Sequence, residues 1–397
     1  MFKSGELKLL WPFYLDALIS PMLFFMPAFL VVYFINIGVS LFQVSLLTAT
    51  MSLAMIIFEI PTGAVADIYG RKFSVLFGAL IQGIAMFSIF FIHNYYFLFV
   101  SFALVGIGVT FNSGAREAWI TDLIHSRDKK LLPSFFSKYA SIDSFAMIFS
   151  GILGAYIVKH FGLSFIWLFT GASFFITFAI LFFAPEYFVR KPVNLDESYR
   201  RLKNQSLTSL SYVRKHFVLF WFLIASAFIV FGGLFGGDLA WITLLTEYGF
   251  PESYFGYMWS VFGVIGVIAP FISFRYSKKK PLKLMAYIIL FLVLANLLII
   301  FAYNYIFILA VLLLTHLFFM MHRPVERTYI HSLIKSKSRA TVVSIESMFL
   351  SLIGVLVLPL VGLSVDFIGA RNTILLSVLF TIPAVFIYLI LGRNKKL

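Results

Sequence analysis

The sequence predicts an all-α membrane protein that crosses the bilayer with twelve helices, arranged as two halves of six. Of its 397 residues, 61% are hydrophobic and only 12% are charged, and the mean hydropathy is +0.98. A soluble domain carries about a quarter charged residues. Long apolar segments recur along the chain, and all the joints between them but one are short. These observations indicate a polytopic membrane protein.

Each predicted span follows from segment length, because a helix needs about 20 mostly apolar residues to cross the hydrocarbon core. Such segments lie at about 10–35, 41–66, 73–92, 96–124, 134–158, 164–184, 215–245, 254–275, 281–301, 304–333, 340–365 and 371–391. The long joint after the sixth span is polar and basic. We therefore expect an N-terminal six-helix bundle at 1–184, a cytoplasmic linker at 185–215 and a C-terminal six-helix bundle at 216–397.

The distribution of basic residues predicts the orientation, because cytoplasmic loops are enriched in Lys and Arg. With the N-terminus in the cytoplasm, the inner side receives the linker and Lys3, Lys8, Arg71, Lys72, Arg127, Lys129, Lys130, Lys138, Lys278, Lys279, Lys280, Lys335, Lys337, Arg339, Arg393, Lys395 and Lys396. Only Lys159 and Arg371 fall outside. We expect a multi-pass protein of the plasma membrane with both termini cytoplasmic. The net charge of +14 is spread over separate loops, so no nucleic-acid partner is predicted.

Several chemistries are excluded by what the sequence lacks. The absence of cysteine excludes disulfides and thiolate metal sites. No nucleophile elbow, phosphate-binding glycine loop or metal-ligand spacing is present, so we predict no enzyme, no cofactor and no metal site. His316, His322 and His331 share the tenth span, but their spacing does not place three imidazoles on one face. We expect them to serve in polar packing.

Weak internal repeats relate the two halves. The segment "WITDLI" at 119–124 matches "YIHSLI" at 329–334, and "SIDSF" at 141–145 matches "SIESM" at 344–348. A third match, 156–164 with 363–371, follows in the same order. Parallel repeats of this kind are typical of transporters that bind a small-molecule substrate near the midplane between the halves.

The loop between the second and third spans carries the most specific motif, Gly63-x-x-x-Asp67-x-x-Gly70-Arg71-Lys72. Together with twelve spans and the long central joint, it resembles the major facilitator superfamily over the whole chain. The resemblance implies a monomeric transporter whose motif Asp and Arg form a charge relay with a carboxylate low on the fourth helix. Asp122 matches that carboxylate by position.

The residues of this cytoplasmic gate motif also have physical roles of their own. Gly63 and Gly70 remove side chains where a helix end and a turn approach a neighbour, and Arg71 and Lys72 suit the anionic membrane surface. One departure is Ile68, where the family usually has a basic residue. The segments 113–122 and 323–344 resemble a bacterial and archaeal branch often described as drug or metabolite exporters. The glycine-proline motif of antiporters in the fifth helix is not present.

Charged residues inside the predicted spans are functional candidates, because a charge in the bilayer is costly. Carboxylates outnumber cations there: the carboxylates are Asp16, Glu59, Glu117, Asp143, Asp238, Glu326 and Glu346, and the cations are Arg116, Arg323 and Arg327. A buried carboxylate without a cation favours its neutral form. The excess therefore predicts protons as the coupling ion. Asp16, Asp143 and Glu346 lie near cytoplasmic helix ends, where contact with water is an equally good explanation.

Depth along the helices and the repeat alignment predict two charge clusters. One comprises Glu59, Arg116, Glu117 and Asp143, and the other Arg323, Glu326, Arg327 and Glu346. We expect the clusters to flank the substrate cavity, to lock its cytoplasmic gate, or to hold helices together as ion pairs. Asp238 follows four glycines in the seventh span, which weaken the helix and permit close approach. Asp238 and Glu59 are the predicted carriers of a proton or a cationic substrate.

Two transport functions remain open at this point. The first is proton-coupled export of small amphipathic or cationic compounds, which the carboxylate excess favours. The second is transport of an anionic metabolite, for which Arg116, Arg323 and Arg327 would clamp a carboxylate or phosphate.

Overall fold

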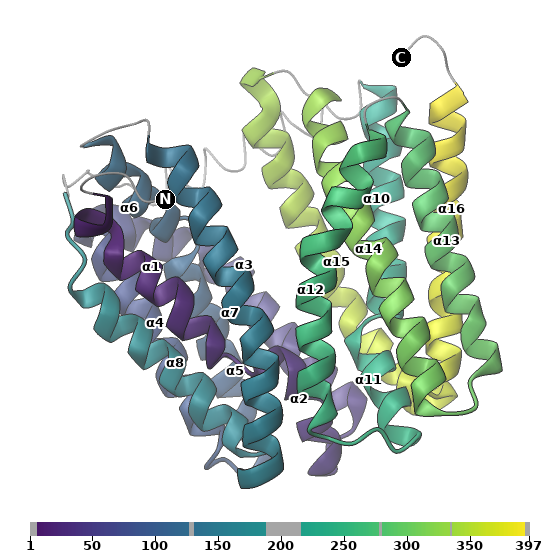
Figure 1. The fold of residues 1–397 in the computed structure, drawn as a ribbon, viewed down its shortest axis with the longest axis horizontal. Helices are drawn as coiled ribbons and strands as arrows, with labels where there is room; N and C mark the ends of the chain where they lie inside the picture. Colours follow the sequence, from purple (N-terminus) through teal and green to yellow (C-terminus); the bar gives the residue numbers. More distant parts are fainter. Residues whose placement is uncertain (1–5, 127–130, 188–215, 278–279, 334–335, 394–397) are drawn as a thin grey trace. The chain divides into compact units, whose positions relative to one another are not determined.

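The computed structural model of the protein describes residues 6–126, 131–187, 216–277, 280–333 and 336–393, without the side chains of 274, 276, 277, 331, 332 and 336–350. The described residues form helices joined by short turns, and no strand is found among them. The helices are α1 (Glu6–Met22), α2 (Met26–Asn36), α3 (Leu41–Tyr69), α4 (Arg71–Ile89), α5 (Tyr95–Asn112), α6 (Ala115–His125), α7 (Leu132–Phe161), α8 (Phe165–Phe182), α10 (Phe217–Phe235), α11 (Asp238–Glu247), α12 (Tyr254–Ser277), α13 (Pro281–Leu297), η2 (Leu298–Phe301), α14 (Tyr305–Leu333), α15 (Ser336–Ile368) and α16 (Ala370–Arg393) (Figure 1).

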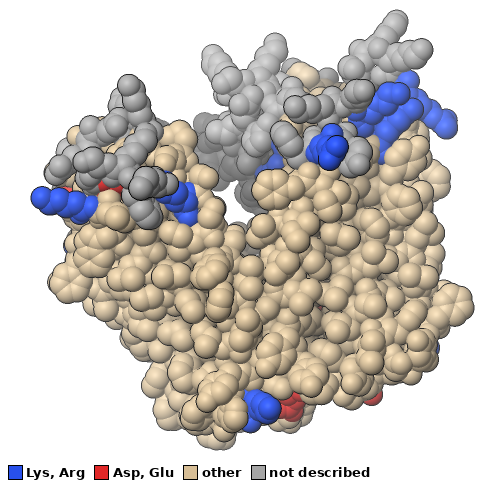
Figure 2. Space-filling view, viewed as in Figure 1, with Lys and Arg blue, Asp and Glu red and all other residues tan. Residues whose placement is uncertain are grey.

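These helices form twelve segments that are long and apolar enough to span a membrane, so the predicted fold class is confirmed. Figure 2 shows that the visible sides of the helices are almost free of charged side chains, and that Lys, Arg, Asp and Glu gather toward the helix ends. This distribution matches the low-charge band that a bilayer requires.

Three of the twelve spans are interrupted, which the sequence analysis anticipated only for the seventh. The first span breaks between α1 and α2, the fourth at Ser113 and Gly114, and the seventh at Gly236 and Gly237. Breaks inside a membrane are tolerated where other groups satisfy the freed backbone. At the first break, the Ser150 hydroxyl donates to Phe24 O at 3.1 Å, and Phe25 N donates to the Thr170 hydroxyl at 3.1 Å.

The chain divides into two compact units. Unit 1 comprises Met1–Tyr33, Thr50–Arg200 and Glu252–Gly263, and unit 2 comprises Phe34–Ala49, Arg201–Pro251 and Val264–Leu397. Each unit takes in one helix segment from the other half of the sequence. The predicted boundaries at 184 and 216 stay a prediction, and most of the linker, 188–215, lies outside the described residues.

Unit 1 is built around α4 and α1. Helix α4 packs against α5 and α8, and α1 packs against α7 and α8. Its core contains Phe13, Trp119 and Phe135, all fully or almost fully buried. The first half of α12 joins this unit through small residues, since the Ser260 hydroxyl donates to Ile148 O at 2.6 Å and a Cβ on Gly151 would overlap Ser260.

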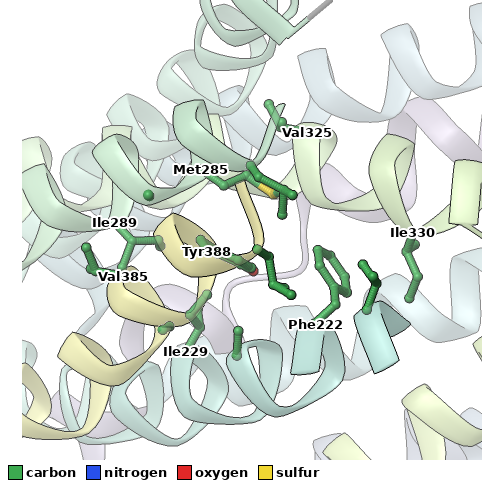
Figure 3. Packing of buried hydrophobic residues seen from close by; sticks show 14 of the residues in the cluster. Phe222, Ile229, Met285, Ile289, Val325, Ile330, Val385 and Tyr388 are labelled. Atoms are coloured by element: carbon green, nitrogen blue, oxygen red, sulfur yellow. The ribbon is translucent and has the colours of Figure 1, made fainter. Parts of the chain in front are cut away.

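Unit 2 is built around α16, which packs against α10 and α13, and α13 in turn packs against α14. Figure 3 shows the apolar core between these helices, with Phe222, Met285 and Tyr388 among its members. The first turn of α3 joins this unit. The carboxylate of Asp366 at the end of α15 accepts hydrogen bonds from Leu41 N at 3.1 Å and Phe42 N at 2.8 Å, and so caps α3.

Candidate functional site

The gate motif brings together the ion pair that the family resemblance implies. Gly70 ends the turn after α3 with φ 105°, a conformation that favours glycine. Arg71, the first residue of α4, forms an ion pair with Asp122 on α6, and its Nη1 also donates to Ala118 O at 2.8 Å. One guanidinium therefore ties the start of α4 to α6 within unit 1.

Lys72 and Glu186 anchor the same turn on the end of α8, a contact that the sequence analysis missed. Lys72 Nζ donates to Phe182 O at 2.7 Å and to Ala184 O at 2.8 Å. The Glu186 carboxylate accepts from Lys72 N at 2.8 Å. A cation at a helix C-terminus and a carboxylate at a helix N-terminus both oppose the helix dipole favourably. Lys72 is thus held by protein carbonyls rather than only by the membrane surface.

The two other motif residues do not make the predicted contacts in the described part of the chain. A Cβ on Gly63 would meet nothing within 4 Å, so no close approach requires a glycine there. Asp67 is exposed, and no hydrogen bond or ion pair to its carboxylate is found among the described residues. The ion pair found at the motif in the described residues therefore joins Arg71 and Asp122 and does not include Asp67.

The first predicted charge cluster is organised around Arg116, but its partner is Asp16. Arg116 Nη2 pairs with Asp16 Oδ2 on α1, and the Asp16 residue is only 2% exposed. Ser20 Oγ donates a second hydrogen bond to Asp16 at 2.6 Å. The guanidinium also lies 5.7 Å from the ring centroid of Tyr139. Asp143 interacts electrostatically with both charges. Arg116 is therefore neutralised inside unit 1.

Glu59, a predicted member of the same cluster, is not paired with Arg116 among the described contacts. Glu59 is exposed on α3, and its Oε1 accepts a hydrogen bond from Ser113 Oγ at 3.0 Å. Ser113 lies in the break between α5 and α6, where Gly114 adopts φ 66°. Glu117 is also exposed, in the first turn of α6, where a carboxylate favours the helix dipole. The sequence could not reveal this arrangement because the break redirects α6.

The second predicted cluster contains Glu326, which is partly buried on α14 beside the buried His322. Glu326 Oε1 accepts a hydrogen bond from Ser226 Oγ on α10 at 2.7 Å, and its Oε2 lies 3.6 Å from His322 Nδ1. His322 is 1% exposed, and its Nε2 lies 3.4 Å from the Tyr388 hydroxyl on α16. Polar packing was the prediction for His322, and it does pack against polar groups, but one of them is the cluster carboxylate.

The remaining members of the second cluster are more open. Arg323 is exposed, and its guanidinium carbon lies 5.2 Å from the ring centroid of Phe319. Arg327 is exposed as well. The side chain of Glu346 lies outside the described residues, so its place in the second cluster stays a prediction.

Asp238 opens α11 directly after the glycine break of the seventh span. Its carboxylate is exposed at the N-terminus of a helix, where the dipole favours a negative charge. A Cβ on Gly232 would overlap the Thr381 hydroxyl of α16, and one on Gly236 would lie 2.9 Å from Ser377 Oγ. Two of the four glycines therefore serve close helix packing.

The ion pair between Glu6 and Lys138 was not predicted. Glu6, fully buried at the start of α1, accepts from Lys138 Nζ on α7 at 2.7 and 2.8 Å and from the Tyr14 hydroxyl at 2.6 Å. This contact fastens α1 to α7 inside unit 1. Among the residues whose side chains are described, no group of three or more metal-ligating side chains is found.

Comparisons with known proteins agree with this architecture. Residues 15–356 match the profile of the Major Facilitator Superfamily. The chain is 22% identical over 256 residues to the uncharacterized MFS-type transporter YxaM of Bacillus subtilis (strain 168), a match that covers 63% of this chain and 61% of that protein.

Solved structures with the same fold include several transporters. A bacterial homologue of the iron transporter ferroportin, in an inward-facing state, is 16% identical, with a TM-score of 0.74 over 97% of this chain and 100% of that one. A bacterial homologue of the human lysosomal transporter Spinster is 15% identical, with a TM-score of 0.74 over 100% and 98%. The POT family transporter PepTSo is 14% identical, with a TM-score of 0.72 over 97% of both chains. These likenesses concern the fold.

Proposed function

Because the chain belongs to the major facilitator superfamily, we propose that it is a secondary transporter that exports small amphipathic or cationic compounds in exchange for protons. The family and the fold are those of transporters, which implies a small-molecule substrate and a multi-pass chain embedded in the lipid bilayer. The proposal places the protein in the plasma membrane with both termini in the cytoplasm and treats it as a monomer.

One observation carries the cation preference. Glu59 in unit 1 and Asp238 in unit 2 are both exposed within membrane spans, and neither contacts a Lys or Arg among the described residues. Two accessible carboxylates of this kind attract a cation that arrives from solution. Arg116 differs from these two carboxylates, because its charge is already neutralised by Asp16.

The test uses ethidium, a fluorescent amphipathic cation, in proteoliposomes with an imposed pH gradient. We expect the gradient to drive ethidium across the membrane with the wild-type protein, and Glu59→Gln or Asp238→Asn to remove that gradient-driven transport. Glu252→Gln, outside the spans, is the matched carboxylate control. Normal transport against a gradient by both E59Q and D238N would overturn the assignment.

An anionic metabolite is the alternative substrate, and the exposed Arg323 and Arg327 on α14 favour it. Replacing each Arg by Ala separates the two. Loss of anion flux in R323A and R327A with the pH-driven ethidium signal unchanged would support the anion; unchanged anion flux would exclude it. A thermal-stabilisation screen of the purified protein identifies candidate compounds for either case, because a ligand that binds the native state raises its apparent stability.

A further inference from the structure

Unit 2 contains a polar pair that combines a histidine with a carboxylate. His322 and Glu326 lie one helical turn apart on α14, with His322 Nδ1 3.6 Å from Glu326 Oε2. Their side chains are 1% and 14% exposed. The imidazole stacks on Tyr388, with ring centroids 5.9 Å apart, and Tyr388 belongs to the apolar core of Figure 3. The pair thus borders the apolar core of the unit.

The charge of this pair depends on protons. Among the residues whose side chains are described, the other group found in contact with the Glu326 carboxylate is the neutral hydroxyl of Ser226. His322 is a cation only when its imidazole is protonated. With one proton shared between them, the pair is neutral, either as imidazole and carboxylic acid or as imidazolium and carboxylate. Loss of that proton leaves a negative charge beside an apolar core, which the membrane interior strongly disfavours.

Two permanent cations follow the pair on α14, Arg323 directly after His322 and Arg327 directly after Glu326, and both are exposed. Arg323, on the same helix, acts electrostatically on His322, but its guanidinium is exposed and lies against Phe319. Helix α16 contributes the Tyr388 hydroxyl, 3.4 Å from His322 Nε2. Helix α13 contributes Leu282, Met285, Ala286 and Ile289 to the apolar core that contains Tyr388.

We propose that His322 and Glu326 share one exchangeable proton and form the binding site for the coupling ion. The proposal rests on the proposed function and adds a division of roles to it. The exposed carboxylates Glu59 and Asp238 meet the cationic substrate, while the pair on α14 holds the proton. Release of the proton then requires water or a cation to reach Glu326, which links proton release to a change at α14.

The corresponding position in unit 1 has no such property. The repeat alignment places Arg116 opposite Glu326, and Arg116 pairs with Asp16. An Arg guanidinium does not lose its proton in proteins. At these equivalent positions of the repeat, the charge in unit 1 is neutralised permanently. The charge in unit 2 is neutralised only while the pair holds its proton.

The proton itself is the probe in the first experiment. The chain has seven histidines, and nitrogen NMR of histidine-labelled protein in detergent distinguishes imidazole from imidazolium. His322→Gln assigns the His322 signal. We expect this signal to titrate in the wild type and Glu326→Gln to shift its midpoint, because the carboxylate no longer shares the proton. Asp366→Asn, a carboxylate change elsewhere in unit 2, is the control and is expected to leave the titration in place.

An identical His322 titration in the wild type and E326Q would overturn the proposal. Each variant is first examined by size-exclusion chromatography and by thermal unfolding. Should E326Q not fold, Glu326→Asp replaces it, since the shorter side chain withdraws the carboxylate from His322 and is also expected to shift the titration. An unshifted midpoint in E326D would equally count against a shared proton.

A transport assay distinguishes a failure of this proposal from a failure of the proposed function. If a pH gradient drives ethidium with the wild type but not with E326Q, the pair is the coupling site. If the gradient drives both equally, the pair is not the coupling site, and proton-coupled export stands without it. If the wild type shows no gradient-driven transport, the proposed function fails, and the titration alone decides whether the pair shares a proton.

Discussion

Helix α6 in unit 1 and helix α14 in unit 2 present a charged residue at positions that the sequence repeat makes equivalent, and they neutralise it differently. Arg116 on α6 meets a fixed opposite charge, Asp16, inside a described network of hydroxyl and aromatic groups. Glu326 on α14 meets a hydroxyl and a histidine. The first arrangement joins two helices through side chains of opposite charge, whereas the proposal gives the second a charge that changes with one proton.

The local backbone differs at the same place. The repeat alignment puts Gly114 opposite Pro324. In unit 1 the helix breaks at Ser113 and Gly114, whereas α14 runs through Pro324 without a break. A proline inside a helix removes one backbone hydrogen bond and bends the helix. Both halves therefore weaken the helix next to the charged residue, by different means.

The largest effect is expected from breaking the permanent pair. Asp16→Asn leaves the Arg116 guanidinium without its countercharge in a buried site, and this is expected to cost about 3–5 kcal/mol of unfolding free energy. Unfolding in mixed micelles of increasing dodecyl sulfate content measures the loss. Asp143→Asn is the control, because Asp143 is less buried and makes no described hydrogen bond. Equal losses of unfolding free energy in D16N and D143N would show that the pair with Asp16 stabilises the protein no more than Asp143 does.

Removing the hydroxyl beside each charge gives a second, smaller comparison. Ser226→Ala leaves Glu326 Oε1 without its donor and is expected to cost about 1–3 kcal/mol. Ser20→Ala is the matched change in unit 1 and is expected to cost less, because Asp16 keeps Arg116. The same unfolding assay compares them. A larger loss in S20A than in S226A would contradict the view that Glu326 depends on neutral partners.

The smallest effect on stability is expected from Glu326→Gln. The amide oxygen can still accept from Ser226, and no permanent cation is left unpaired, so we expect a loss under about 1 kcal/mol. This result would contrast with the large loss in D16N at the equivalent contact. A loss in E326Q as large as that in D16N would mean that Glu326 belongs to a fixed ion pair as well.

The sequence was sufficient for the membrane spans because length and hydropathy determine them. All twelve spans were predicted to within a few residues at most ends, and the glycine break before Asp238 could be anticipated from "FGGLFGG". The pairing of Arg71 with Asp122 followed from the family resemblance rather than from any local signal.

The contacts that could not be predicted from the sequence join residues that lie far apart in the chain. Asp16 and Arg116 are 100 residues apart, and nothing in either segment indicates that α1 and α6 meet. The same holds for Glu6 with Lys138 and for Lys72 with the end of α8. The contact of Glu59 with Ser113, which lies in the break between α5 and α6, also joins two distant segments. The sequence does indicate one contact of His322, because Glu326 lies four residues further along the same helix, on the same face.

The charge movement that follows a pH jump on proteoliposomes adsorbed to a solid-supported membrane tests the central claim most directly, because it requires no known substrate. The account predicts a transient current with the wild type, its loss in E326Q, and its retention in the control variant D366N. A transient of equal size in the wild type and E326Q would contradict the assignment of the exchangeable proton to His322 and Glu326.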